Sequence, residues 1–327
     1  MRAGGGIGVQ FFFVLSGFLI TYIILEEKSR TGQFNLRHFF ARRILRIWPL
    51  YYLMILVAFL TPWVTEQVLN VSTSPVGYEP DWWMSLLFLE NYKMMITGSH
   101  PNVSPLGVMW SLCIEEHFYI IWGLLLYFIP VRKLPVVIVC SVLIGYISRY
   151  FYAGYGIPAL DIFTNIDLFA FGAVPAYLLI TRRFATENAL LRVPFWVKLL
   201  FTAILIIVVQ VCSQHTGNDY AFVTLTMVLG VMFAILLSFT IPRHTRFRIG
   251  DKNILSSLGL YTYGLYLYHT IIITLLRVLY PVLGLSTDTP GGAILFIIIA
   301  LLATIGCSMV SYYIFERPFL KLKKWFR

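Results

Sequence analysis

A carboxylate with hydroxyl neighbours lies inside a long apolar stretch of this chain, residues 106–129. Ser111, Glu115, Tyr119 and Trp122 recur there at helical spacing, so one helix face carries an acid, two hydroxyls and an indole. Burying a charge is costly, at least about 2.5 kcal/mol at the centre of a membrane helix. We therefore expect this face, with Glu115, to point into a helix bundle or a wet cavity.

Two further acids are candidates for a polar core. Glu116 lies about 100° around the helix from Glu115 and should have partners of its own. Asp167, in Asn-Ile-Asp-Leu-Phe-Ala-Phe-Gly, is another buried-acid candidate. Glu-Glu-His at 115–117 is a weak metal motif, because adjacent residues diverge around a helix and no second His falls four residues on. The four cysteines form no Cys/His cluster, so we expect neither a zinc site nor a disulfide framework.

A histidine ends a run rich in tyrosine, Tyr-Thr-Tyr-Gly-Leu-Tyr-Leu-Tyr-His, at position 269. Thr262, Tyr266 and His269 fall on one stripe of a helix. A single intramembrane His is often a hydrogen-bonded structural residue, and it can equally transfer protons or contact a substrate. The residues alone leave both interpretations of His269 open.

Three arginines stand at the start of another apolar stretch, in His-Phe-Phe-Ala-Arg-Arg-Ile-Leu-Arg-Ile-Trp-Pro. Arg42 and Arg46 are four residues apart and Arg43 and Arg46 three, so a helix places them on adjoining faces. Guanidinium groups with this spacing suit bidentate contacts with phosphate. With their apolar neighbours they equally suit an amphipathic segment on anionic lipid. Spacing alone does not choose between these two interpretations.

A small-residue pair, Ser16-Gly17, interrupts the apolar run Gln-Phe-Phe-Phe-Val-Leu-Ser-Gly-Phe-Leu-Ile. Small residues let another helix approach closely, so packing alone can explain the pair. A polar-core role for Ser16 is the alternative.

The composition of the chain indicates that lipid rather than water surrounds these segments. Hydrophobic residues make up 59% of the chain and charged residues 12%, whereas about a quarter of a soluble domain is charged. Lipid must therefore cover much of the exterior, and the many aromatic residues suit belts at the two membrane interfaces. The predicted fold class is all-α, a polytopic membrane helix bundle, rather than a large soluble core.

The apolar stretches predict about nine membrane crossings, since a spanning helix needs roughly 20 apolar residues. They are residues 7–25, 47–65, 106–129, 134–152, 162–180, 195–213, 219–241, 254–280 and 291–315. Residues 82–96 carry Glu90 and Lys93 and are too polar to span, so we expect an interfacial or re-entrant piece there.

The basic residues predict the orientation. If residues 26–46 are cytoplasmic, then 130–133, 181–198, 242–253 and 316–327 are cytoplasmic too, and these segments hold most of the 25 Lys and Arg residues. The exceptions are Arg2, Lys93, Arg149 and Arg277. This positive-inside pattern puts the C-terminus in the cytoplasm. It also accounts for the net charge of +10 without a nucleic-acid partner.

In these segments the chain resembles the membrane-bound acyltransferase 3 family. The resemblance rests on FFFVLSGFLI, FFARRILRIWPLYY, WSLCIEEHFYIIW, DLFAFGAVPAYL, LGLYTYGLYLYH and SYYIFERPFLKL, which follow the family's order from residue 7 to about residue 324. It implies one transmembrane domain over residues 1–327, in the inner membrane of a bacterium. Members are multi-helix enzymes that O-acylate, usually O-acetylate, extracytoplasmic glycans, with acetyl-CoA as the cytoplasmic donor. Acceptors across the family include lipopolysaccharide O-antigen, exopolysaccharide, peptidoglycan, Nod factors and macrolide sugars.

The resemblance also implies roles for single residues. Arg43-Ile-Leu-Arg46 matches the family's Arg-x-x-Arg element at the acyl-CoA end, which favours phosphate contacts for the arginine group that includes Arg42. Glu115 occupies the acid of the Trp-Ser-Leu motif, and His269 the histidine after the tyrosine-rich run. Both are therefore candidates for the base that activates a hydroxyl of a glycan or lipid-linked sugar.

One departure from the family concerns the start of the chain. Members open with one more helix, ten in all, which carries an Arg and, about eleven residues later, the His considered catalytic. We expect this helix to be absent here, and no soluble extracytoplasmic domain to follow residues 321–327, so that any periplasmic partner is a separate protein. An inactive or truncated membrane scaffold is therefore the alternative function. A small-molecule transporter is a weaker one, because no repeat between the halves is visible.

Overall fold

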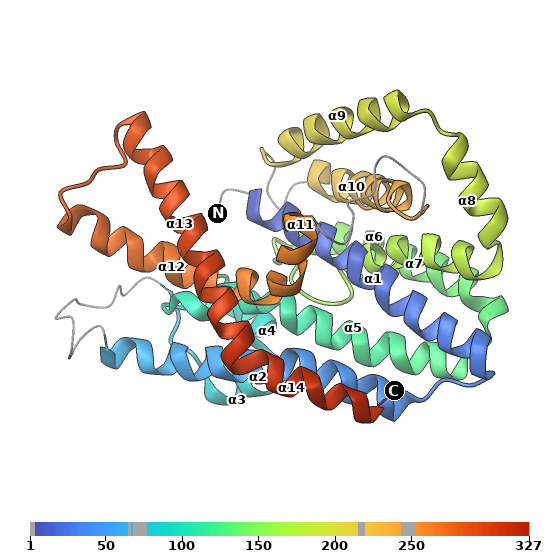
Figure 1. The fold of residues 1–327 in the computed structure, drawn as a ribbon, viewed down its shortest axis with the longest axis horizontal. Coiled ribbons are helices and arrows are strands. Elements are labelled where there is room, and N and C mark those ends of the chain that lie inside the picture. The colour runs from blue at the N-terminus through green and yellow to red at the C-terminus, as the bar shows by residue number, and fades with distance from the viewer. Residues whose placement is uncertain (1–3, 65–66, 68–76, 215–219, 243–252, 327) are drawn as a thin grey trace. The chain divides into compact units, whose positions relative to one another are not determined.

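The computed structural model describes residues 4–64, 67, 77–214, 220–242 and 253–326. Arg2 and almost all of the basic segment 242–253 lie outside this described part. Within it the secondary structure is helical, apart from one isolated bridge between Tyr78 and Pro101 (Figure 1). The predicted all-α fold class is confirmed.

The long helices follow the predicted apolar stretches. They are α1 Gly4–Thr31, α2 Leu36–Trp63, α5 Met109–Phe128, α6 Leu134–Gly154, α7 Ile166–Thr181, α9 Phe195–Cys212, α10 Tyr220–Phe239, α12 Thr262–Val282 and α13 Pro290–Ser311. The shorter ones are α3 Trp82–Leu86, α4 Glu90–Thr97, α8 Arg183–Arg192, α11 Ile254–Leu258 and α14 Arg317–Leu322.

Eight helices of the described part are long and apolar enough to cross a membrane, or nine if the bent pair α7 and α8 counts as one span. The predicted stretch 162–180 supplies the ninth span only in the second count, because α7 has just 16 residues and α8 turns away from it by 114°. The α7 helix begins late because Asp161 and Thr164 close a turn, in which the Thr164 amide donates to Asp161 Oδ1 at 2.8 Å. The polar stretch 82–96 forms α3 and α4, which are too short to span.

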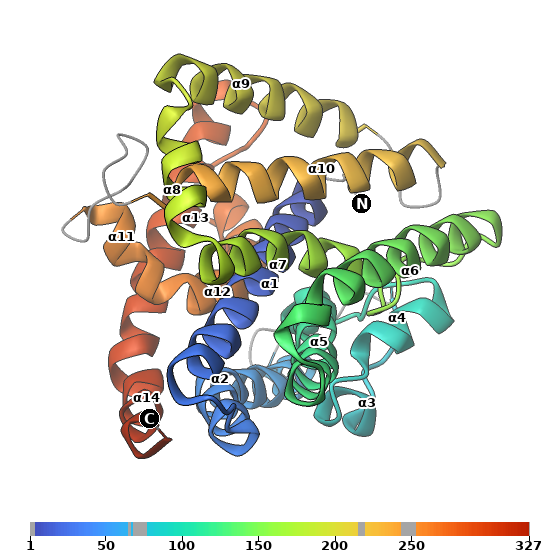
Figure 2. The same ribbon diagram turned by 90° about the vertical axis from the view of Figure 1, so that its right-hand side faces the viewer.

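The chain divides into two compact units, and the division falls inside α5. Unit 1 comprises Met1–Leu36 and Cys113–Arg248, and unit 2 comprises Arg37–Leu112 and Ile249–Arg327. In unit 1, α7 packs against α1, α6 and α10 (Figure 2). In unit 2, α12 packs against α13 and against the 3-10 turn Ser104–Val108, and a π-helical turn, Tyr312–Glu316, joins α13 to α14.

Two glycines allow α1 and α7 to cross at backbone contact. A Cβ atom on Gly17 would lie 2.0 Å from the main-chain oxygen of Phe169, and one on Gly172 would lie 1.9 Å from that of Val14. Neither space admits a side chain. The packing interpretation of the Ser16-Gly17 pair is therefore confirmed for Gly17.

Candidate functional site

The imidazole of His269 is held in one orientation by its own helix. Its Nδ1 lies 2.5 Å from the main-chain oxygen of Tyr266 on α12. A carbonyl oxygen only accepts hydrogen bonds, so Nδ1 carries the hydrogen and Nε2 keeps its lone pair. The side chain is half-buried. His269 therefore has the tautomer and the access that a proton acceptor needs.

Tyr266 is itself fixed where the 3-10 turn Ser104–Val108 meets the start of α5. Its hydroxyl lies 2.5 Å from Ser111 Oγ and donates to the main-chain oxygen of Val108 at 2.9 Å. The residue that orients His269 is thus anchored at its other end by Ser111. The sequence pattern had grouped Ser111 with Glu115, whereas the structure connects Ser111 to the α12 stripe.

The three predicted arginines lie in the first part of α2, and the C-terminal segment packs against them. Arg42 Nη1 donates to the main-chain oxygen of Phe326 at 2.7 Å. Lys323 lies within electrostatic range of Arg42, Arg43 and Arg46. We call these four residues the cation cluster. Like charges this close favour an anionic ligand that neutralises them.

Sequence reasoning missed two members of this region, Lys323 and Glu316. Lys323 was assigned only to a basic cytoplasmic end, and its approach to the arginines depends on tertiary packing. Glu316 is buried at the end of the π-helical turn, accepts from Ser311 Oγ at 3.4 Å, and interacts electrostatically with Arg46. The motif SYYIFERPFLKL contains Glu316 and ends one residue before Lys323, and an acid among apolar residues followed by a lysine run was the available signal.

The cation cluster and His269 belong to the same unit and are linked through α12. Tyr263 OH donates at 2.8 Å to the main-chain oxygen of Ile47, the residue that follows Arg46. Tyr263 precedes His269 by six residues, which is about 9 Å along a helix. Unit 2 therefore carries a group of cations and an oriented imidazole joined by one short stretch of helix.

Glu115 belongs to unit 1, where α1 supplies one of its partners. Its carboxylate accepts from Ser16 Oγ at 3.2 Å and from Tyr119 OH at 2.8 Å. Trp122, fully buried, donates from Nε1 to Thr21 Oγ1 at 2.9 Å. The predicted polar face of α5 is thus turned toward other side chains of unit 1 at these three α5 positions, and Ser16 contributes a hydroxyl donor to Glu115.

The other predicted acids have different surroundings. Asp167 pairs with Arg149, whose Nη1 also donates to the main-chain oxygen of Thr164 at 2.6 Å, and both charged side chains are buried. This compensated pair holds α6 to α7 and leaves Asp167 unsuited to be a base. Glu116 is buried as well. Across the residues that the structure describes, no group of three or more His, Cys, Asp or Glu side chains could hold a metal ion.

Comparison with known proteins decides the family. The model of the acyltransferase 3 family, described as an acyltransferase domain, matches residues 1–313. The chain belongs to this family. The predicted resemblance is confirmed by this match, and the family member is a multi-pass membrane protein.

Two relatives are named as O-acetyltransferases of bacteria. The peptidoglycan O-acetyltransferase OatA of Listeria monocytogenes is 29% identical over 342 residues, which covers 97% of this chain and 52% of that protein. The putative peptidoglycan O-acetyltransferase YrhL of Bacillus subtilis is 29% identical over 341 residues, which covers 96% of this chain and 50% of that protein. The chain spans about half the length of these two relatives. No solved structure matches it.

Proposed function

We propose that this family member is a membrane-bound O-acyltransferase that moves an acetyl group from cytoplasmic acetyl-CoA to a hydroxyl of a cell-wall glycan outside the membrane. The names of the two relatives favour peptidoglycan as the acceptor. The observation that carries the proposal is the combination, within unit 2, of the cation cluster with the oriented imidazole of His269. The first suits a phosphorylated donor, and the second suits activation of a hydroxyl.

The cation cluster is proposed to bind the phosphates of coenzyme A. A lipid headgroup would explain arginines on one face of α2, but it would not require a lysine from another segment. Lys323 comes from the C-terminal turn, and Arg42 fixes that turn through the oxygen of Phe326. A cluster assembled from two segments resembles a ligand site more than an amphipathic face.

His269 is proposed as the general base. Its Nε2 accepts the proton of the acceptor hydroxyl while that oxygen bonds to the thioester carbonyl carbon; the carbon–sulfur bond then breaks, and the departing thiolate takes the proton from the imidazolium. The main-chain oxygen of Tyr266 keeps the ring in position. Glu115, with its two hydroxyl donors, is the second candidate for an acid or base in unit 1.

The proposed topology follows the basic residues. With the segments 26–46 and 316–327 in the cytoplasm, the turn between α12 and α13 lies on the outer side of the cytoplasmic membrane. The donor then enters at the cation cluster, and the glycan is reached from outside. A separate extracytoplasmic partner protein stays a prediction.

A direct test uses the purified chain in lipid vesicles with acetyl-labelled acetyl-CoA and an amino-sugar oligosaccharide. We expect label on the glycan that depends on both substrates and carries the properties of an ester. Release of label only as acetate, or none at all, would favour the scaffold. Uptake of intact substrate into the vesicles would favour the transporter.

A further inference from the structure

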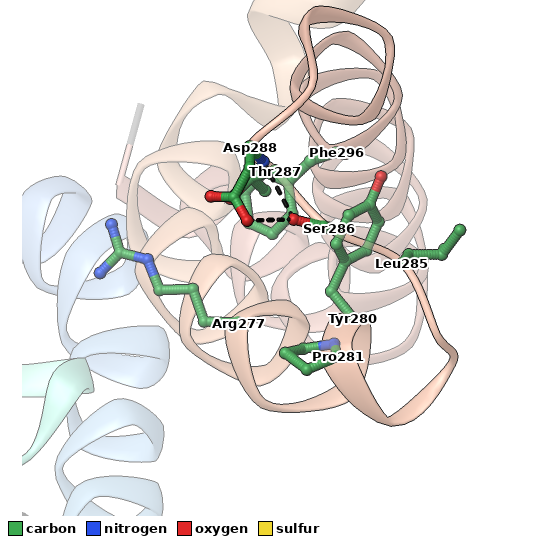
Figure 3. A pocket seen from close by; sticks show the side chains of 8 residues that line it. All are labelled: Arg277, Tyr280, Pro281, Leu285, Ser286, Thr287, Asp288 and Phe296. Atoms are coloured by element: carbon green, nitrogen blue, oxygen red, sulfur yellow. Dashed lines mark hydrogen bonds between the residues drawn. The ribbon is translucent and has the colours of Figure 1, made fainter.

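A second site lies at the turn between α12 and α13, at the proposed outer end of unit 2. The pocket has a volume of about 540 Å³, within the range of small-ligand sites. Its lining residues are Arg277, Tyr280, Pro281, Leu285, Ser286, Thr287, Asp288 and Phe296 (Figure 3). It thus combines a cation, an acid, two hydroxyls and two aromatic rings in one hairpin.

The charged groups of this pocket are not consumed by internal pairing. Arg277 is exposed, and in the described part of the chain it has no hydrogen bond or ion pair. One oxygen of Asp288, Oδ2, accepts from Ser286 Oγ at 2.6 Å, and the Asp288 amide donates back to that hydroxyl at 3.1 Å. The turn is therefore preformed, with the second oxygen of Asp288 available to a ligand.

The aromatic residues form a firm apolar wall. Tyr280 is buried, donates its hydroxyl to the main-chain oxygen of Gly292 at 2.7 Å, and meets the half-buried ring of Phe296 edge-on at 5.3 Å. Figure 3 shows the polar ends of Arg277 and Asp288 on one side of the pocket and the Tyr280 ring on the other. A ligand here must present an apolar face and several polar groups at once.

A saccharide meets these requirements. Its ring has an apolar C–H face for the aromatic wall, hydroxyls that donate to Asp288, and, in an acidic or N-acylated sugar, an oxygen that accepts from Arg277. An anionic lipid headgroup could pair with Arg277, but it has no ring with an apolar C–H face for the wall of Tyr280 and Phe296. The combination of charged groups with an aromatic wall therefore favours a sugar over a lipid.

The pocket lies within reach of the proposed base. Arg277 follows His269 by eight residues on α12, about 12 Å along the helix, and Tyr280 follows by eleven, within about 20° of the same face. We propose that this pocket binds a carboxylate-bearing amino sugar of the acceptor glycan, next to the sugar residue that receives the acyl group. The inference rests on the proposed function, which it extends to the acceptor side.

The test measures saccharide binding to the full chain in lipid nanodiscs without any acyl donor. The probes are the disaccharide of N-acetylglucosamine and N-acetylmuramic acid, and chitobiose, its counterpart without the carboxylate. The variants are Arg277→Gln and Asp288→Asn. Leu283→Ala is the matched control, since Leu283 is 70% exposed on the same hairpin and does not line the pocket. Thermal unfolding of each variant shows that the fold is kept.

We expect Arg277→Gln to weaken binding of the acidic disaccharide about tenfold and binding of chitobiose less than twofold. The reason is that a charged hydrogen bond is lost only with the acidic disaccharide. Asp288→Asn should weaken both probes, and Leu283→Ala neither. The proposal is overturned if the wild type binds neither probe, if both variants bind like the wild type, or if added phosphatidylglycerol displaces the disaccharide. If Arg277→Gln transfers acetyl groups with an unaltered KM for the glycan, only the proposal of this saccharide site is contradicted. If the wild type binds the saccharide but transfers no acetyl group, only the proposed function is contradicted.

Discussion

His269 Nδ1 lies 2.5 Å from the main-chain oxygen of Tyr266. The contact leaves Nε2 as the proton acceptor of the ring, and the side chain of the same tyrosine is anchored to Ser111. The acceptor is a main-chain oxygen of the same helix, so motion of the Tyr266 side chain does not remove it. The orientation of the imidazole therefore depends on the backbone of α12 rather than on the Tyr266 ring.

Removal of the base should lower the rate of transfer without affecting donor binding. We expect His269→Gln to reduce kcat by about 10²–10⁴-fold, the usual contribution of a general base, with little change in the KM for acetyl-CoA. Initial rates of glycan labelling measure this. Leu275→Ala, an exposed position on the same helix, should act like the wild type. A His269→Gln enzyme with the wild-type rate would leave His269 as a structural residue.

Loss of a cation from the cation cluster should instead weaken binding of the acyl donor. Arg46→Ala should raise the KM for acetyl-CoA about tenfold or more, because charged hydrogen bonds to phosphate contribute roughly 1.5–3 kcal/mol each. Arg37→Ala removes the same charge from an exposed position on α2 and should change KM little. Equal effects of the two substitutions would indicate attraction to the membrane surface rather than a donor site.

The crossing of α1 and α7 should tolerate no side chain. Gly17→Ala should destabilise the protein by about 1–3 kcal/mol or more, because the new Cβ would meet the backbone of Phe169 at 2.0 Å. Gly306→Ala on α13 is the control, since nothing lies within 4 Å of its Cβ position. Thermal unfolding in detergent compares the two. A Gly17→Ala protein as stable as Gly306→Ala would mean that the two helices do not cross at this contact.

The helices were predictable because each one depends on a run of apolar residues within its own segment. Which helices become neighbours was not, because that depends on contacts between distant residues. Gly17 indicated a close approach but could not name Phe169 as its partner. The same limit hid Lys323, which reaches Arg42, Arg43 and Arg46 only through the fold. His269 was identified by its motif, while its tautomer required the position of Tyr266.

Asp167 is an acid whose partner the sequence did not show: the motif made it a candidate for the polar core, and the structure pairs it with Arg149. Asp167→Asn should destabilise the protein by about 3–5 kcal/mol, since it leaves Arg149 buried without its counter-charge. The double variant Arg149→Met/Asp167→Asn should recover part of that loss. Chemical unfolding compares the free energies of unfolding of the wild type, the Asp167→Asn variant and the double variant. A single variant that folds normally and yet transfers no acyl group would instead make Asp167 catalytic.

The central claim is that unit 2 joins a donor site to a base for acyl transfer to a glycan. It is tested most directly by time courses of acetyl transfer from labelled acetyl-CoA to an amino-sugar oligosaccharide, with the full chain in vesicles. The account predicts transfer by the wild type, a raised donor KM in Arg46→Ala, and a lowered kcat in His269→Gln. Full transfer by a protein that carries both substitutions would contradict it.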